Sequence, residues 1–239
     1  MNPVILAPIH RPRDAWSLLG NVVRQRASIP TLVIENGSAK GAYDGPGEVR
    51  YVEGVSTAGA ARNACLEAAR AAGFDAFIFF DADDFYDPTY VASRLGLLAQ
   101  GYDAIGKTQG WCMLDDGLYR FGASGSILPS GGTYAGLVAS ALPFDDRLTV
   151  GEDHAWWRAM TAAGRRMHLD LDRAGYVYMR HDANTWQMPS ALVRLGRGPA
   201  EYFGHELPST PLGCVEVRDE PTSEEIFRVL HDASSYKTK

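Results

Sequence analysis

Three carboxylates come directly after an apolar run in the first half of the chain. Asp81, Asp83 and Asp84 follow the segment Ala-Phe-Ile-Phe-Phe, residues 76–80. Acids this close together repel one another unless a cation or hydrogen-bond donors compensate. Two carboxylates at positions i and i+2 of a turn can present oxygens to a hard divalent ion, and Mg²⁺ typically binds through one or two carboxylates plus substrate phosphates. We therefore favour a metal and phosphate site here over a solvated loop.

Two more groups of polar residues occupy positions suited to chemistry. Glu152 and Asp153 follow Gly151 at the start of a helix-like segment. Acids are favoured at a helix N-terminus by the helix dipole, so capping explains them as well as a general base does, and both interpretations stay open. His181 follows the short apolar run 176–179 and is either a third metal ligand or an ordinary loop histidine.

Apolar runs and helical periodicity alternate along the first half of the chain, which indicates how these residues are positioned. Runs without polar alternation, separated by helices, predict a mostly parallel sheet covered on both faces. The segments typical of buried strands are 3–9, 31–34, 49–52 and 76–80, followed later by 167–171 and 176–179. The segments with helical spacing are 15–27, 58–72, 89–99 and 152–163.

The predicted fold class is therefore α/β, with a mostly parallel central sheet and helices on both faces. Ligands bind such sheets beyond the carboxyl ends of the strands, which singles out the loops after Ile9, Ile34, Val52 and Phe80. The glycine-rich segment 105–143 predicts short antiparallel strands and loops that complete the sheet. We expect one domain over residues 1–205 and a C-terminal extension over 206–239 with one short helix at 224–231.

Composition excludes several classes of protein. The 239 residues are 46% hydrophobic, which rules out disorder for most of the chain, and the net charge of −6 argues against bulk attraction to nucleic acid. Three scattered cysteines predict neither a disulfide framework nor a structural zinc site. Neither a signal peptide nor a run of about 20 apolar residues is apparent, so we expect a cytoplasmic protein without a transmembrane segment.

Four motifs, taken in order along the chain, resemble a known family. They are Val33-Ile34-Glu35-Asn36-Gly37-Ser38, Ala61-Arg62-Asn63, Asp81-Ala82-Asp83-Asp84 and Gly151-Glu152-Asp153. Each stands at a predicted strand end or helix start. Together they resemble the family-2 glycosyltransferases, which have the GT-A (Rossmann-like) fold, with the third motif in the place of the D-x-D sequence. The resemblance implies an inverting, hexosyltransferase-like enzyme that uses a nucleotide-sugar, with a UDP-sugar favoured, and Mn²⁺ or Mg²⁺.

The resemblance also implies roles for individual residues. Asp153 corresponds to the catalytic base, with Glu152 as its neighbour. Asp83 and Asp81 would hold the metal ion together with His181. The residues expected to bind the donor are Pro8, His10, Arg11, Glu35, Asn36, Arg62, Asn63, Asp81, Ala82 and Asp83. This sequence has Glu35 and Asn36 where the family usually has two aspartates, and His10 and Arg11 where it usually has Tyr-Asn, so base selectivity is open.

The acceptor is not specified by the resemblance, and a glycan, a lipid-linked sugar, a protein, a metabolite or a modified DNA base would all fit. Core packing explains most large aromatics. Trp156 and Trp157 are adjacent in a helix and cannot share one face, so we expect one of them to line a pocket. The residues that we place on the acceptor side are Trp111, Gly132, Thr133, Trp156 and Trp157.

Parts of the sequence also match motifs of three other kinds of protein. Residues 101–108 match the GxxxxGK[ST] pattern literally, but a helix-like segment precedes them, so we expect no P-loop. A non-catalytic nucleotide-sugar or glycan-binding module would keep Asp81 and Asp83 without needing Asp153. An aspartyl-nucleophile phosphohydrolase would carry its D-x-D motif after the first strand, whereas here the motif follows the fourth.

Overall fold

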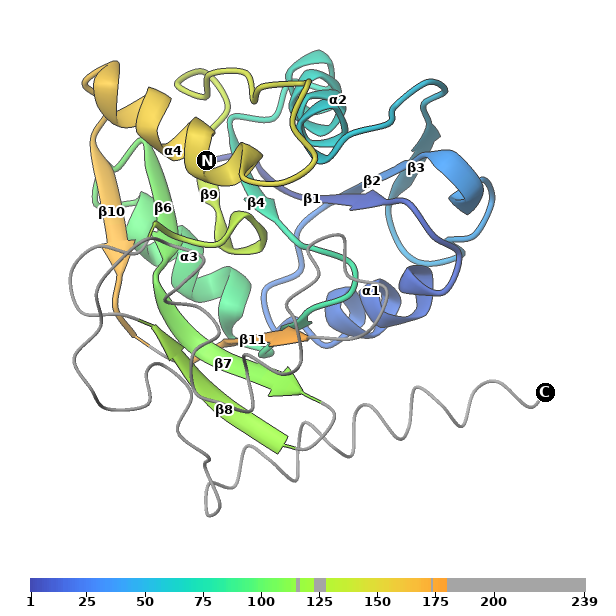
Figure 1. Ribbon diagram of the computed structural model, residues 1–239, viewed down its shortest axis with the longest axis horizontal. Coiled ribbons are helices and arrows are strands. Elements are labelled where there is room, and N and C mark those ends of the chain that lie inside the picture. Colours follow the sequence, from blue (N-terminus) through green and yellow to red (C-terminus); the bar gives the residue numbers. More distant parts are fainter. Residues whose placement is uncertain (115–116, 123–127, 173, 180–239) are drawn as a thin grey trace.

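The computed structural model describes residues 1–114, 117–122, 128–172 and 174–179 (Figure 1). Its main feature is a seven-stranded sheet in the order β10-β6-β9-β4-β1-β2-β3. Every neighbouring pair is parallel except those made by β9, which runs antiparallel to both β4 and β6. This confirms the predicted mixed α/β fold with a mostly parallel sheet. The strands are β1 (Pro3–Ile9), β2 (Thr31–Glu35), β3 (Glu48–Tyr51), β4 (Ala76–Phe79), β6 (Ala104–Lys107), β9 (Ala135–Leu137) and β10 (Met167–Asp170).

Four helices cover the two faces of this sheet. They are α1 (Asp14–Val23), α2 (Ala58–Ala71), α3 (Tyr90–Leu98) and α4 (Glu152–Ala162). One core cluster contains residues of α1 and α3, and the other contains residues of α2 and α4, so each pair covers one face (Figure 1). Strand β1 supplies both clusters, with Ile5 on the first side and Leu6 on the second. A strand with both faces buried lacks polar alternation, which is why the sequence shows continuous apolar runs.

A second, smaller sheet has the order β5-β11-β7-β8. Its strands are β5 (Phe85–Tyr86), β7 (Gln109–Leu114), β8 (Gly117–Gly122) and β11 (Tyr176–Met179). The segment that matches the P-loop pattern forms a glycine turn at Gly101 and then strand β6, and β7 follows without a helix. The expected absence of a P-loop is therefore consistent with the fold at this point.

The sequence-based boundaries are accurate to a few residues except in one helix. The helix expected over 15–27 ends at Val23. The Arg26 amide donates to the Pro88 carbonyl at 2.8 Å, and the Gln25 side chain donates to the Asp87 carbonyl at 3.0 Å. The chain after Val23 is therefore held by the segment before α3 and does not continue the helix.

The remaining expectations about organisation concern residues that the structure does not describe. The domain boundary at 205 and the short helix at 224–231 lie outside the described residues. Within the described part of the chain, no helix is long and apolar enough to cross a membrane.

The strand order identifies one edge of the sheet as the place for a ligand. The chain moves from β1 to β2 on one side, and later returns to β4 on the other side of β1. Such a reversal leaves a crevice between the carboxyl ends of the two flanking strands, here β1 and β4. The segments that leave these strands are residues 10–13 and 80–84, which include the acids singled out by the sequence.

Candidate active site

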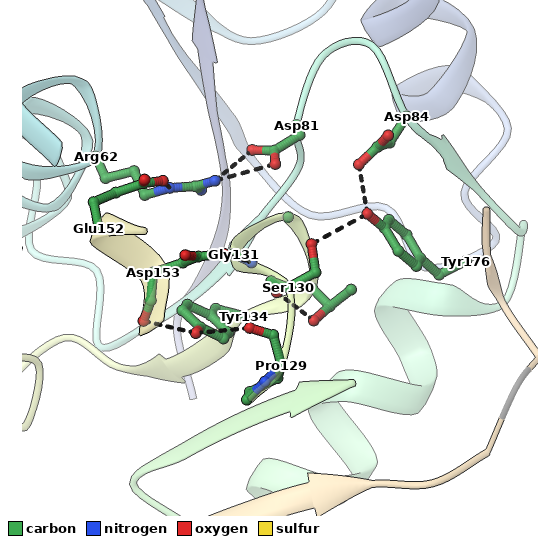
Figure 2. Close-up of polar contacts among 12 residues, drawn as sticks. Arg62, Asp81, Asp84, Pro129, Ser130, Gly131, Tyr134, Glu152, Asp153 and Tyr176 are labelled. Atoms are coloured by element: carbon green, nitrogen blue, oxygen red, sulfur yellow. Dashed lines mark hydrogen bonds and ion pairs between the residues drawn. The ribbon is translucent and has the colours of Figure 1, made fainter. Parts of the chain in front are cut away.

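The three acids after β4 point in three directions. Both carboxylate oxygens of Asp81 accept hydrogen bonds from Arg62 Nη2, at 2.9 and 3.1 Å (Figure 2). Asp83 Oδ2 lies 3.4 Å from Arg11 Nη2, and its side chain is 23% exposed. Asp84 is buried on the other side of the turn. A single motif in the sequence therefore supplies side chains with different surroundings.

Arg62 links Asp81 to the start of α4. Its Nε lies 3.4 Å from Glu152 Oε1, and its guanidinium carbon lies 5.0 Å from the centre of the Phe79 ring. The side chain is buried, and its Nη1 has no hydrogen-bond partner among the described residues. A buried arginine with one unpaired nitrogen retains a donor for a further acceptor. We call Arg62, Asp81, Glu152 and Asp153 the Arg62 cluster.

Burial and charge act against each other throughout the Arg62 cluster. Burial disfavours the charge on Arg62, but Asp81 and Glu152 outweigh burial and raise its pKa. Burial raises the pKa of Asp81, and Arg62 opposes that shift. Burial likewise raises the pKa of Glu152 to about 7, with Arg62 opposing and Asp153 reinforcing the shift. Strongly perturbed acids that share one cation are typical of functional sites.

Asp153 is held by backbone amides at the start of α4. Its Oδ2 accepts a hydrogen bond from the Gly131 amide at 3.0 Å, and its Oδ1 accepts one from the His154 amide at 2.7 Å. Gly151 precedes the helix with φ of 79°, a left-handed conformation that favours glycine. The helix therefore delivers Glu152 and Asp153 together to the sheet edge.

The Gly131–Gly132 pair packs against the cluster so closely that side chains are excluded. A Cβ on Gly131 would lie 2.8 Å from Arg62 Nη2, and one on Gly132 would lie 2.6 Å from Asp81 Oδ2. The two glycines belong to the short 3₁₀ turn Gly131–Thr133 that leads into β9. Glycine is required here by the close approach of backbone to charged side chains.

Asp84 stabilises the join between the two sheets. Tyr176 donates its hydroxyl hydrogen to Asp84 Oδ2 at 2.6 Å, and the Met179 amide donates to Oδ1 at 2.9 Å (Figure 2). Burial, with Asp83 and Asp81 nearby, raises the pKa of Asp84 well above its ordinary value. Both oxygens of this acid are therefore used by strand β11, which is remote in the sequence.

Three of the expected donor-binding residues lie together at the ends of β1 and β2. His10 Nδ1 is 2.6 Å from Asn36 Oδ1. The Glu35 carboxylate accepts hydrogen bonds from the amides of Gly41 and Tyr43, at 2.6 and 2.8 Å. Glu35 thus orders the loop that follows it, and its part in donor binding stays a prediction.

Three other expected donor-site residues are placed as follows. Asn63 uses both ends of its amide on the backbone of Phe144, at 2.7 and 3.0 Å. The Ala82 side chain lies in the core beside α1 and α3, and Pro8 is partly buried in β1. Their part in donor binding remains a prediction without a contact in the structure that tests it.

The residues assigned to the acceptor side are mostly buried. Trp156 is 1% exposed, stacks on Phe144 with ring centres 5.0 Å apart, and donates to the Leu142 carbonyl at 2.7 Å. Trp157 is also buried, and the expectation that one of the two lines a pocket stays a prediction. Tyr134 packs against both rings, and Phe144 packs against Trp156.

Two of the remaining acceptor-side residues are buried as well, and one lies at the cluster. Thr133 is fully buried, with its hydroxyl donating to the Ser130 carbonyl at 2.6 Å and accepting from the Lys107 amide at 2.9 Å. Trp111 is buried in β7. Gly132 stands beside Asp81, as described above.

A divalent cation was expected at the acids, and the described residues can be tested for it. They contain no group of three or more His, Cys, Asp or Glu side chains arranged for a metal ion. Asp81 is paired with Arg62, Asp83 lies 3.4 Å from Arg11 Nη2, and Asp84 is bound by β11, so a metal ion at these acids stays a prediction. His181 lies outside the described residues.

Tyrosines form a part of the site that the sequence analysis missed. Tyr86 accepts a hydrogen bond from the Asp81 amide and donates one to the Gly132 carbonyl, both at 2.7 Å. Tyr134 and Tyr176 contact the segments that carry Asp153 and Asp84. The spacing of Tyr86 from the acid motif was visible in the sequence, but the partners of Tyr134 and Tyr176 are remote.

Comparison with known proteins finds solved structures of similar fold. A search of protein-family models finds no match, and a search of curated proteins finds none. The structure of S. aureus TarS 1-349 matches with a TM-score of 0.57 and 14% identity, over 75% of this chain and 60% of that chain. The same protein in complex with UDP-GlcNAc matches with a TM-score of 0.55 and 13% identity, over 82% of this chain and 65% of that chain.

The likeness concerns the fold. At these identities the match shows a shared GT-A-like, Rossmann-type α/β architecture, which confirms the fold expected from the four motifs. The chain spans less than two thirds of the length of the TarS structures that it matches.

Proposed function

We propose that this chain transfers a sugar from a nucleotide-sugar to an acceptor hydroxyl with inversion at the anomeric carbon. The carrying observation is that Asp81, at the end of β4, and Glu152, at the start of α4, meet at Arg62 beside the switch point of the sheet. The matched TarS structures include complexes with UDP and with UDP-GlcNAc, which supports a UDP-sugar as the donor.

The residues of this chain have distinct parts in the proposed reaction. Asp153 accepts the proton of the acceptor hydroxyl as its oxygen bonds to the anomeric carbon, and the bond from that carbon to the diphosphate breaks. The amides of Gly131 and His154 fix the orientation of the Asp153 carboxylate. Arg62 Nη1, which has no partner in the part of the chain that the structure describes, is assigned to an acceptor atom of the donor.

The diphosphate needs positive charge as it leaves. Bound Mn²⁺ or Mg²⁺ would neutralise the developing charge, and Asp83 is the described residue that would hold the cation. Arg11, which lies 3.4 Å from Asp83, adds a guanidinium on the same side. With Asp81 bound to Arg62, the acids of this edge do not all compete for one ion.

The test is the release of nucleoside diphosphate from a panel of nucleotide-sugars, including UDP-GlcNAc, with Mn²⁺ or Mg²⁺ added. We expect at least one donor to be consumed and Asp153→Asn to lower its turnover by about 100- to 10,000-fold, because a positioned base contributes about that much. The affinity for UDP, measured by calorimetry, should change less than about threefold because the substitution keeps the shape of the side chain.

The matched control is Asp145→Asn, which changes a partly exposed acid paired with the exposed Arg147. This variant should retain full turnover. Binding of donors by the wild-type chain without any release would instead identify a non-catalytic binding module. Full activity of Asp153→Asn would remove the assigned base.

A further inference from the structure

Tyr134 connects the two acid-bearing parts of the site. Its hydroxyl lies 2.9 Å from the Asp153 carbonyl and 3.0 Å from the Pro129 carbonyl, and these two acceptors share its one hydrogen (Figure 2). Its own carbonyl accepts a hydrogen bond from the Phe79 amide at 2.8 Å. Phe79 is the last residue of β4, two residues before Asp81. One residue therefore binds the helix that carries Asp153 and the strand that carries Asp81.

The surroundings of Tyr134 hold its ring in one place. The side chain is fully buried, and its ring centre lies 5.0 Å from that of Trp156 and 5.5 Å from that of Trp157. Two neighbouring tryptophans of α4 therefore pack against the ring. Burial, with Asp153 nearby, raises the pKa of Tyr134 well above its ordinary value, so the hydroxyl keeps its hydrogen and remains a donor.

The turn beside Tyr134 transmits the same restraint to the carboxylate. Gly131 donates its amide hydrogen to Asp153 Oδ2, and the Tyr134 amide donates to the Gly131 carbonyl at 3.2 Å. Tyr134 therefore contacts Asp153 directly, through the Asp153 carbonyl, and indirectly, through Gly131. Loss of the hydroxyl removes the direct hydrogen bond and leaves the contact through Gly131 alone.

We propose that Tyr134 is a positioning residue that sets the distance and orientation of Asp153 relative to Asp81. This inference rests on the proposed function, in which Asp153 takes the proton and Asp81 lies near the donor. Tyr134 touches neither reactant, so it acts through the two acids. Misplacement of a catalytic group by about 1 Å can lower a rate by about 100-fold.

The test uses Tyr134→Phe in the full chain, with the donor that the wild-type chain consumes fastest and water as acceptor. We expect kcat for nucleoside diphosphate release to fall by about 10- to 100-fold. KM for the donor and the affinity for UDP should change less than about twofold, because the donor contacts on β1, β2 and Asp83 are kept.

The matched control is Tyr90→Phe. Tyr90 is equally buried, and its hydroxyl donates to the carbonyl of Thr133 at 3.1 Å, one residue away in the same turn. Both variants lose one buried hydroxyl near the turn, so we expect melting temperatures lowered to a similar extent. A fall of kcat in Tyr134→Phe alone then separates positioning from a general loss of stability.

Three results would overturn the inference. Unchanged kcat in Tyr134→Phe would do so, as would an equal fall in both variants or a parallel loss of UDP affinity. If Tyr134→Phe does not fold, Trp157→Phe, which reduces the ring beside Tyr134, should lower kcat severalfold with KM kept. A wild-type chain that consumes no donor would refute the proposed function, and this outcome is distinct because it needs no variant.

Discussion

Two buried charge clusters lie at the same edge of the main sheet and have opposite compositions. In the Arg62 cluster one cation contacts two acids, Asp81 and Glu152. In the other, which we call the Asp170 cluster, one acid at the end of β10 contacts two cations, Arg94 and Lys107. Both clusters are built by side chains from separate elements, and their opposite compositions indicate different roles.

The two clusters differ in their access to solvent. The Asp81 side chain is 26% exposed, whereas those of Asp170, Arg94 and Lys107 are 9%, 3% and 1% exposed. The Asp170 cluster joins α3, β6 and β10, and its charges face one another. An excess of acid at a partly open site suits a cation, whereas the closed cluster fastens elements together.

The largest expected effect separates the clusters by stability. Asp170→Asn leaves Arg94 and Lys107 buried without their counter-ion, and removal of one partner from a buried ion pair costs about 3–5 kcal/mol. Urea unfolding should show that loss, while folded Asp170→Asn should bind UDP as the wild-type chain does. The partly exposed Asp145→Asn variant serves as control and should unfold like the wild-type chain. A stable Asp170→Asn variant would contradict the fastening role.

The second prediction is that the clusters give stability opposite dependences on pH. Burial raises the pKa of Glu152 to about 7 from 4.5, so the folded state binds a proton there more tightly, and stability should fall as pH rises from about 4.5 to about 7. At about 1.4 kcal/mol per pKa unit, the change reaches up to about 3 kcal/mol.

Asp170 should act at the acid end of the scale. Burial opposes its ionisation, but Arg94 and Lys107 outweigh burial and lower its pKa to about 2 from 3.8. Its contribution, up to about 2 kcal/mol, is present above about pH 4 and lost as pH falls towards 2. The plot of stability against pH should therefore flatten between about pH 4.5 and 7 in Glu152→Gln and between about pH 4 and 2 in Asp170→Asn. The same slope change in both variants would show that the clusters are not distinct.

The smallest predicted effect concerns the glycine turn beside the Arg62 cluster. Gly132→Ala brings a methyl group within 2.6 Å of Asp81 Oδ2, so the carboxylate must move. We expect a loss of about 1–3 kcal/mol, as in overpacked sites, together with weaker UDP binding. Calorimetry and urea unfolding measure the two effects.

Gly96→Ala provides the control for the glycine substitution. Gly96 lies in α3, and an added Cβ there meets nothing within 4 Å. Alanine favours a helix over glycine by up to about 1 kcal/mol, so this variant should be slightly more stable, with UDP binding unchanged. Equal loss of UDP affinity in both variants would show that the turn is not special.

The sequence was sufficient for features that depend on neighbouring residues. The apolar runs that end at Ile9 and Phe80 predicted β1 and β4, and the acids after Phe80 were correctly placed at a sheet edge. The different hydrogen-bond partners of those three acids were not predictable. Asp84 is buried because Tyr176, far along the chain, donates to it.

Nonlocal packing also decides the surroundings of the two tryptophans. Helix periodicity predicted that Trp156 and Trp157 do not share one face, but it could not show that both rings would pack against Tyr134. The segment that supplies Tyr134 read only as glycine-rich and irregular. A pattern within one helix carries no information on a turn that another part of the chain brings to it.

The antiparallel direction of β9 affects which segment of the chain can vary during evolution. The parallel strands end at this edge of the sheet, whereas the antiparallel β9 begins there. The turn Gly131–Thr133, which precedes β9, therefore lies beside Asp81. The segment upstream of this entrance can be lengthened or replaced while the strand order stays fixed. Under the proposed function, a lineage that exchanged this one insertion would change the acceptor side and inherit the donor half of the sheet unaltered.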